Sequence, residues 1–186
     1  MTIAILAGGA SSRFGQDKAT LFLPRVLAAC QPLNLPIVIV GRSESDLELP
    51  TSAACLPDAF PGQGPLGGLI TALRHTDGPV LLLPCDLAFL ETAALLWLLA
   101  QWEQSPKDLP VISTESLTGI QGDVAYEPLF SVYPQSSLDH AESLLTNGRR
   151  SMHQLLKHQG YQEALLPEHL LPQLRNINTP EDLTLR

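Results

Sequence analysis

The side chains best suited to chemistry gather first in a glycine-rich turn near the N-terminus. An apolar run over residues 1–7 ends in Gly8 and Gly9, and two cations follow at Arg13 and Lys18. Because glycine has no Cβ atom, the backbone N–H groups of such a turn can approach an anion closely. A planar guanidinium and a compact ammonium add two kinds of positive charge beside these amides. The spacing therefore predicts a site for the phosphates of a nucleoside triphosphate.

This turn differs from the two commonest phosphate-binding motifs. A P-loop requires Gly-Lys-Ser/Thr, whereas residues 15–18 read Gly-Gln-Asp-Lys, and the dinucleotide fingerprint G-x-G-x-x-G is also missing from the sequence. A plain strand-to-helix turn with two exposed cations is the alternative interpretation. It accounts less well for the placement of both cations beside the glycines.

A carboxylate in the middle of the chain is the candidate metal ligand. Asp86 follows the apolar run of residues 79–83 directly. Magnesium needs only one or two protein carboxylates and takes its remaining ligands from phosphate and water, so Asp86 could hold Mg²⁺ beside the predicted triphosphate. The alternative is that Asp86 is the N-cap of a helix over residues 90–104.

A second glycine-rich stretch, residues 57–69, leads into a predicted helix over residues 66–75. The N-terminus of a helix presents unpaired N–H donors and a positive dipole, which favour an anionic ligand. The carboxylate of Asp58 is chemically suited to guanine, whose N1–H and N2–H₂ groups are neighbouring donors. A plain loop with a capped helix explains the same residues without a ligand.

The elements that must position these residues alternate along the chain. Strands are expected at residues 2–6, 36–40, 53–56, 79–83, 109–113 and 124–133, the last of them antiparallel. Helices are expected at residues 18–31, 66–75, 90–104, 136–145, 151–158 and 176–186, and Pro24 should lie near the start of the first helix or break it.

Near-continuous apolar strands that alternate with helices indicate an α/β fold, with a mostly parallel, mixed sheet covered on both faces in three layers. Ligands of such sheets bind outside the carboxyl ends of the strands, so Gly8 and Asp86 should lie on one edge. One domain over residues 1–186 is expected.

Composition excludes several classes of function. The net charge of −8 argues against nucleic acid or an anionic membrane surface as partner. The apolar stretch near residues 93–100 is far shorter than the roughly 20 residues of a membrane helix. Three widely spaced cysteines indicate reduced thiols and a cytoplasmic protein.

The segment LAGG-x3-R-F-G-x-D-K, from Leu6 to Lys18, resembles the signature of the molybdenum cofactor guanylyltransferase (MobA-like) family of the nucleotidyltransferases. The segments around residues 58–69 and 84–86 are similar to two further motifs of that family. Weaker likenesses cover residues 126–133, which would face a pterin substrate, and residues 176–182. Arg149 and Arg150 are candidate contacts for an anionic second substrate.

The resemblance implies a Rossmann-like nucleotidyltransferase fold and the transfer of GMP from GTP to molybdenum-bearing molybdopterin, with Mg²⁺ as cofactor. It implies that Arg13, Lys18 and Asp86 are catalytic, and that Asp86 is the metal ligand. The nucleotide would be bound by Lys18, Asp58 and Asp86 together with the loop residues Leu6, Ala7, Gly8 and Gly9. Other cofactor-assembly proteins are implied as partners.

Two alternatives stay open. A related transferase could use CTP or another phosphorylated acceptor, because a glycine loop grips phosphates common to all nucleotides. A non-catalytic nucleotide-binding adaptor is favoured by the short segment after Lys18 and by the missing Asn in the run Val-Gly-Arg-Ser of residues 40–43. The retained Arg13, Lys18 and Asp86 oppose it.

Overall fold

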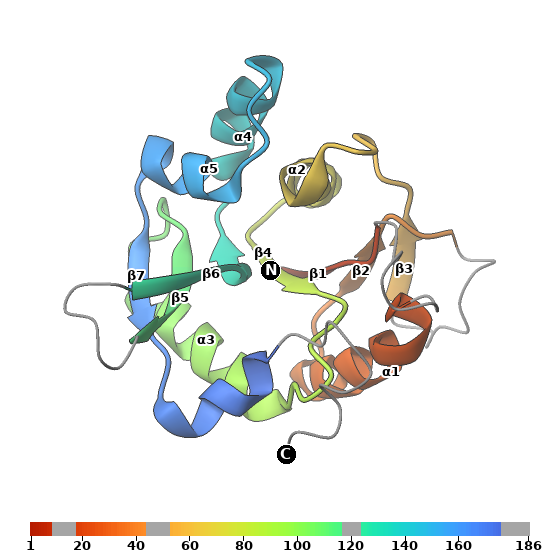
Figure 1. The fold of residues 1–186 in the computed structure, drawn as a ribbon, viewed down its shortest axis with the longest axis vertical. Coiled ribbons are helices and arrows are strands. Elements are labelled where there is room, and N and C mark those ends of the chain that lie inside the picture. The colour runs from red at the N-terminus through yellow and green to blue at the C-terminus, as the bar shows by residue number, and fades with distance from the viewer. Residues whose placement is uncertain (9–17, 44–52, 117–123, 176–186) are drawn as a thin grey trace.

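The computed structural model describes residues 1–8, 18–43, 53–116 and 124–175; for residues 18, 19, 115, 116, 124 and 125 it describes the backbone alone. Seven strands form one sheet in the order β3-β2-β1-β4-β6-β5-β7 (Figure 1). Their bounds are β1 Thr2–Leu6, β2 Ile37–Val40, β3 Ala53–Leu56, β4 Val80–Pro84, β5 Val111–Ser116, β6 Val124–Tyr133 and β7 Gln162–Leu165.

Pairing in the sheet is parallel except around β6. Strands β3, β2, β1 and β4 run parallel to one another, β6 is antiparallel to both β4 and β5, and β7 is parallel to β5. The register of β5 on β6 shifts between Ile112 and Ser113, which marks a bulge. The expected α/β class with a mixed, mostly parallel sheet is confirmed.

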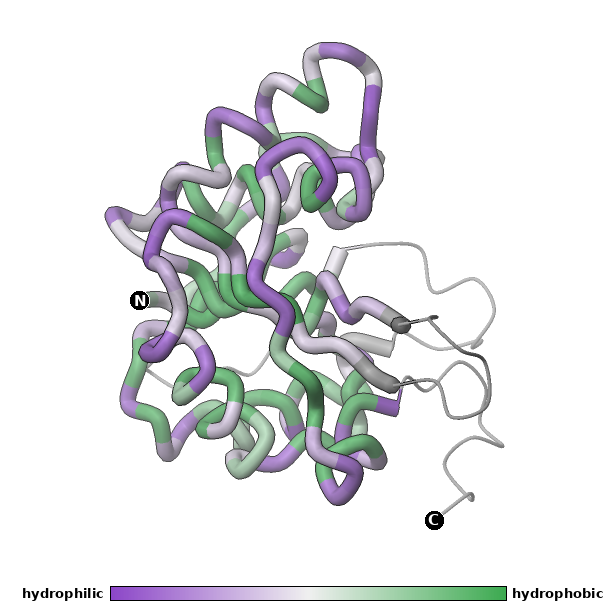
Figure 2. Tube along the Cα trace, turned by 90° about the vertical axis from the view of Figure 1, so that its left-hand side faces the viewer, coloured by the Kyte–Doolittle hydropathy of each residue, from purple (hydrophilic) through white to green (hydrophobic). Residues whose placement is uncertain are grey.

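Helices cover both faces of this sheet, as Figure 1 shows. The helices are α1 Lys18–Cys30, α2 Gly64–His75, α3 Thr92–Gln104, α4 Ser137–Thr146 and α5 Met152–Gln159, with 3₁₀ turns at Gln31–Leu33 and Glu168–Leu174. One apolar cluster joins α1, α3 and the second 3₁₀ turn to the sheet, and another joins α2, α4 and α5 to its opposite face. Apolar segments run along the centre of the molecule and polar ones along its outer turns (Figure 2). Among these helices, none is long and apolar enough to cross a bilayer.

Strand β1 lies between the two apolar clusters, and it is buried on both faces. Ile3 and Ile5 belong to the cluster with α1 and α3, whereas Ala4 faces the cluster with α2. Helix α2 comes very close to this strand, because a Cβ at Gly68 would lie 2.7 Å from a methyl carbon of Leu6. The absence of a side chain at Gly68 therefore allows α2 to pack this close to the end of β1.

The expectation that Pro24 lies near the start of α1 or breaks it is wrong. Pro24 lies inside a helix that continues from Lys18 to Cys30. Its ring is on the exposed side, while Leu23, Val26 and Leu27 are buried against the sheet. We attribute the intact helix to this packing, which offsets the hydrogen bond that the proline nitrogen cannot donate.

Two elements near the C-terminus were not expected from the sequence. Strand β7 extends the sheet beside β5, and the 3₁₀ turn Glu168–Leu174 adds Leu170 and Leu174 to the cluster with α3. The helix expected over residues 176–186 lies outside the described residues.

The close approach at Gly68 can be tested by adding a methyl group. We expect Gly68→Ala to lower the free energy of unfolding by about 1 kcal/mol, because displacing the buried end of Leu6 costs more than the roughly 1 kcal/mol that alanine gains over glycine inside a helix. Urea denaturation measures the loss. Combining it with Leu6→Val should recover part of the loss, because the shorter side chain makes room; losses that simply add would contradict the contact.

Candidate functional site

The ends of β1 and β4 lie side by side at one edge of the sheet. Leu6 is in register with Pro84, and the N–H of Cys85 donates to the Leu6 carbonyl at 3.1 Å. Gly8 and Asp86 each stand two residues beyond this paired position, on strands that run in the same direction. The structure therefore places the glycine turn and Asp86 at the same edge, as the strand pattern predicts.

Asp86 is not a helix N-cap. Helix α3 begins at Thr92, and Glu91 occupies its N-cap position. Asp86 instead opens a tight connection in which its own carbonyl accepts the N–H of Ala88 at 3.0 Å, and its side chain is partly buried. The alternative interpretation of this residue as a cap is wrong, and its carboxylate stays at the sheet edge.

The turn after β1 packs directly on the turn after β2. Gly41 has a positive φ of 91°, and a Cβ there would lie 2.6 Å from the Cα of Gly8 and 2.8 Å from its nitrogen. The Ala7 N–H donates to the Val40 carbonyl at 2.9 Å, which fixes where the two turns cross. Gly41 is therefore a requirement of packing and backbone conformation.

Arg42 is a cation at this edge to which sequence reasoning gave no role. Its Nε donates to the Ala7 carbonyl at 2.9 Å. Both hydrogen-bonding groups of the Ala7 backbone are thus engaged within the protein. The signal in the sequence was a cation two residues beyond the end of a buried strand, since the residues that follow parallel strands reach the same edge of the sheet.

Asp58 shapes the loop that leads into α2. Its Oδ1 accepts the Phe60 N–H at 2.9 Å and lies 3.2 Å from the Thr71 hydroxyl. That hydroxyl in turn accepts the Ala59 N–H at 3.1 Å. These contacts bind the loop to the body of α2. Because β3, β2 and β1 are parallel, Asp58, two residues beyond β3, lies at the same edge of the sheet as Gly8.

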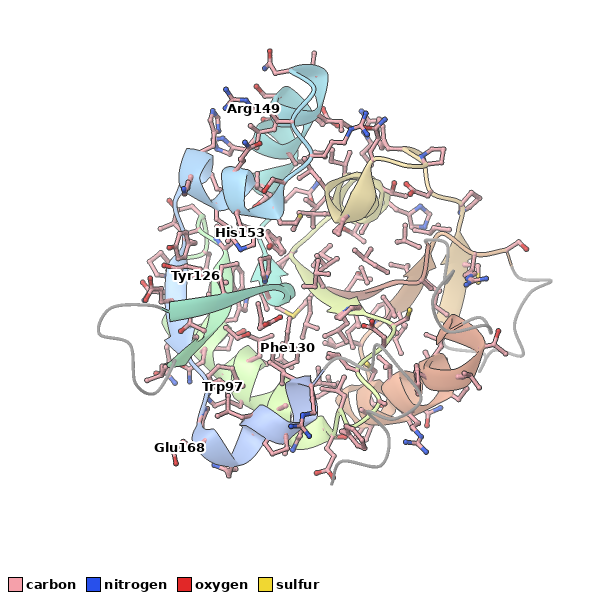
Figure 3. The ribbon with its side chains drawn as sticks, in the orientation of Figure 1. Trp97, Tyr126, Phe130, Arg149, His153 and Glu168 are labelled. Carbon is pink, nitrogen blue, oxygen red and sulfur yellow. The ribbon has the colours of Figure 1, made fainter. Side chains whose placement is uncertain are left out.

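A cavity of about 380 Å³ lies between α2 and α4. Phe60 and Gln63, from the loop before α2, line one side, and Arg150 lines it from the connection between α4 and α5. Arg74 stacks its guanidinium 4.9 Å from the Phe60 ring centre and pairs with Glu142 at 2.7 Å. The neighbouring Arg149 is exposed in the same connection (Figure 3).

The structure describes the remaining predicted site residues only in part. Gly9 and Arg13 lie outside the described residues, and the side chain of Lys18, the first residue of α1, is not described. In the described ranges, no group of three or more His, Cys, Asp or Glu side chains could hold a metal ion. One carboxylate at a phosphate site nevertheless suits Mg²⁺.

Comparisons with known proteins assign this architecture to a family. Residues 3–164 match the model of the MobA-like NTP transferase domain. The chain belongs to this family. It is 32% identical to a probable molybdenum cofactor guanylyltransferase of Nostoc sp. (strain PCC 7120), an alignment that covers 100% of this chain and 89% of the relative.

Solved structures agree with the assignment. The chain matches the molybdopterin-guanine dinucleotide biosynthesis protein A from Archaeoglobus fulgidus with a TM-score of 0.78 and 27% identity, over 99% of this chain and 95% of that one. It also matches the 4-diphosphocytidyl-2C-methyl-D-erythritolsynthase from Anaerococcus prevotii, with a TM-score of 0.70, 12% identity and coverage of 98% and 92%. The second likeness shows the nucleotidyltransferase fold alone.

The contact between the turns after β1 and β2 predicts that substitution of Gly41 destabilises the fold. We expect Gly41→Ala to lower the free energy of unfolding by about 1–3 kcal/mol more than the control Gly148→Ala. Both glycines have a positive φ, but a Cβ at Gly148 would meet no atom within 4 Å. Chemical denaturation compares the two, and equal losses would mean that the contact with Gly8 adds nothing.

Proposed function

We propose that this MobA-like protein transfers GMP from GTP to the phosphate of molybdenum-bearing molybdopterin and releases pyrophosphate. The observation that carries the proposal is that the glycine turn after β1 and the carboxylate after β4 share one edge of the sheet. Membership of the MobA-like NTP transferase domain family supports the reaction class. The names of the relatives support the choice of substrates.

In this reaction the acceptor phosphate oxygen attacks the α-phosphorus of GTP in line. A new P–O bond forms to the acceptor while the bond from the α-phosphorus to the β-phosphate oxygen breaks, and pyrophosphate leaves with its negative charge. The protein contributes positioning and charge neutralisation, with no covalent step of its own.

Different residues at this edge of the sheet would bind different phosphates of GTP. We assign the amides of Gly8 and Gly9, with Arg13, to the β- and γ-phosphates, and Lys18 to the α-phosphoryl oxygens. The sequence motif also predicts phosphate contacts from the Leu6 and Ala7 amides, but the Ala7 N–H pairs with the Val40 carbonyl, so we assign to Leu6 and Ala7 the positioning of the glycine turn. Asp86 is the residue that would hold Mg²⁺, which neutralises phosphate charge when bound.

We assign the acceptor to the side of the site where α2 and α4 meet. The cavity there has a planar stack of the Arg74 guanidinium on the Phe60 ring, and a cation at Arg150. A pterin ring and an anionic group suit these two features. The proposed setting is the cytoplasm, where the three free cysteines stay reduced.

Removing the predicted charges should abolish turnover and leave the fold intact. We expect Asp86→Asn and Lys18→Ala each to reduce GTP-dependent pyrophosphate release by at least about 100-fold, since each removes charge that stabilises the transition state. The assay supplies GTP, Mg²⁺ and molybdopterin. Asp77→Asn is the matched control, because Asp77 is exposed at the opposite end of β4. Near wild-type release from Asp86→Asn would remove Asp86 from the mechanism.

A nucleotide panel separates the alternatives. With Mg²⁺ present, we expect GTP to raise the melting temperature more than CTP or ATP at equal concentration, because only the preferred base adds contacts to those of the phosphates. A larger shift with CTP would favour a cytidylyltransferase. A GTP shift without pyrophosphate release in the presence of molybdopterin would favour the adaptor.

A further inference from the structure

Two histidines face each other where α4 packs against α5, away from the glycine turn and Asp86. The Nδ1 atoms of His140 and His158 are 3.1 Å apart, and the ring centres are 5.2 Å apart with planes at 69°. His158 is exposed and His140 partly exposed. At this distance one ring can donate an Nδ1–H to the Nδ1 lone pair of the other, with the roles set by the tautomers.

The distance between the two nitrogens also fits a chelate. Two metal–nitrogen bonds of about 2.0–2.1 Å, meeting at an angle between about 90° and 110°, put their nitrogens about 2.9–3.4 Å apart. The observed 3.1 Å falls within this range. We propose that His140 and His158 form a binding site for a divalent transition-metal ion that bridges α4 and α5.

The chemistry of the ligands selects the ion. Neutral imidazole suits Cu²⁺, Zn²⁺ and Ni²⁺, and Cu²⁺ binds most strongly of the divalent first-row series. Binding requires a lone pair on each Nδ1, so in the metal-bound form each ring carries its proton on Nε2. Mg²⁺ prefers oxygen ligands, so this site is chemically distinct from the one proposed at Asp86.

Two protein ligands make an open and exchangeable site. In the part of the chain that the structure describes, no third His, Cys, Asp or Glu side chain completes a metal cluster. Water therefore occupies the other positions of the ion. Because the two histidines come from different helices, a bound ion would fasten the start of α4 to the end of α5, at the helix ends away from the connection that carries Arg150.

The test is a Cu²⁺ titration of the full chain without a polyhistidine tag, followed by calorimetry and by electron paramagnetic resonance. We expect one ion per chain with two nitrogen ligands. His140→Ala and His158→Ala should each weaken binding by at least about tenfold, because only one imidazole remains. Mg²⁺ should not compete.

His153→Ala is the matched control, since His153 is exposed on α5 and has the same side chain (Figure 3). Circular dichroism checks that every variant is folded. Unchanged Cu²⁺ affinity in His140→Ala or His158→Ala, or an equal loss in His153→Ala, would overturn the proposal. So would the absence of Cu²⁺ binding to the wild-type chain. None of these outcomes bears on GTP turnover, so the two proposals fail independently.

Discussion

The parallel pairing of β1 with β4 is the constraint on which the rest of the site depends. It sets Leu6 against Pro84, so the residues that follow both strands emerge at one edge of the sheet. Reversing either five-residue strand would move its following loop by about 16 Å, to the far edge. No side-chain rearrangement could then bring Asp86 to the same triphosphate as Gly8.

A second constraint comes from the crowding around β1. Gly41 leaves room for the backbone of Gly8, and Gly68 leaves room for the side chain of Leu6. A Cβ at Gly67 would likewise lie 2.9 Å from the carbonyl oxygen of Phe60. Glycines in this region thus have two distinct uses. Gly8 is proposed to bring its backbone close to a ligand, whereas Gly41, Gly67 and Gly68 let parts of the protein approach one another.

The sequence predicts what local patterns and strand direction control. Continuous apolar strands separated by helices predict the α/β class, and the shared edge for Gly8 and Asp86 follows from parallel strands alone. Contacts between segments that are far apart in the sequence cannot be predicted in this way. The hydrogen bond from Arg42 to Ala7 joins residues 35 positions apart, and β7 is a short strand with mostly exposed side chains that is defined by its pairing with β5. Pro24 was misjudged because local propensity was weighed without the packing of α1.

Asp58 shows how such contacts limit a chemical assignment. A carboxylate that reads guanine needs both oxygens, one for N1–H and one for N2–H₂. In this structure Oδ1 accepts the Phe60 N–H and lies within hydrogen-bonding distance of the Thr71 hydroxyl. The Thr71 hydroxyl can donate either to this oxygen or to the Gly67 carbonyl, which lies 2.9 Å from the hydroxyl oxygen. When it donates to Oδ1, both lone pairs of Oδ1 are in use. The contacts of Asp58 therefore shape the loop before α2, and while Thr71 donates to Oδ1 only Oδ2 is left for the proposed contact with a base.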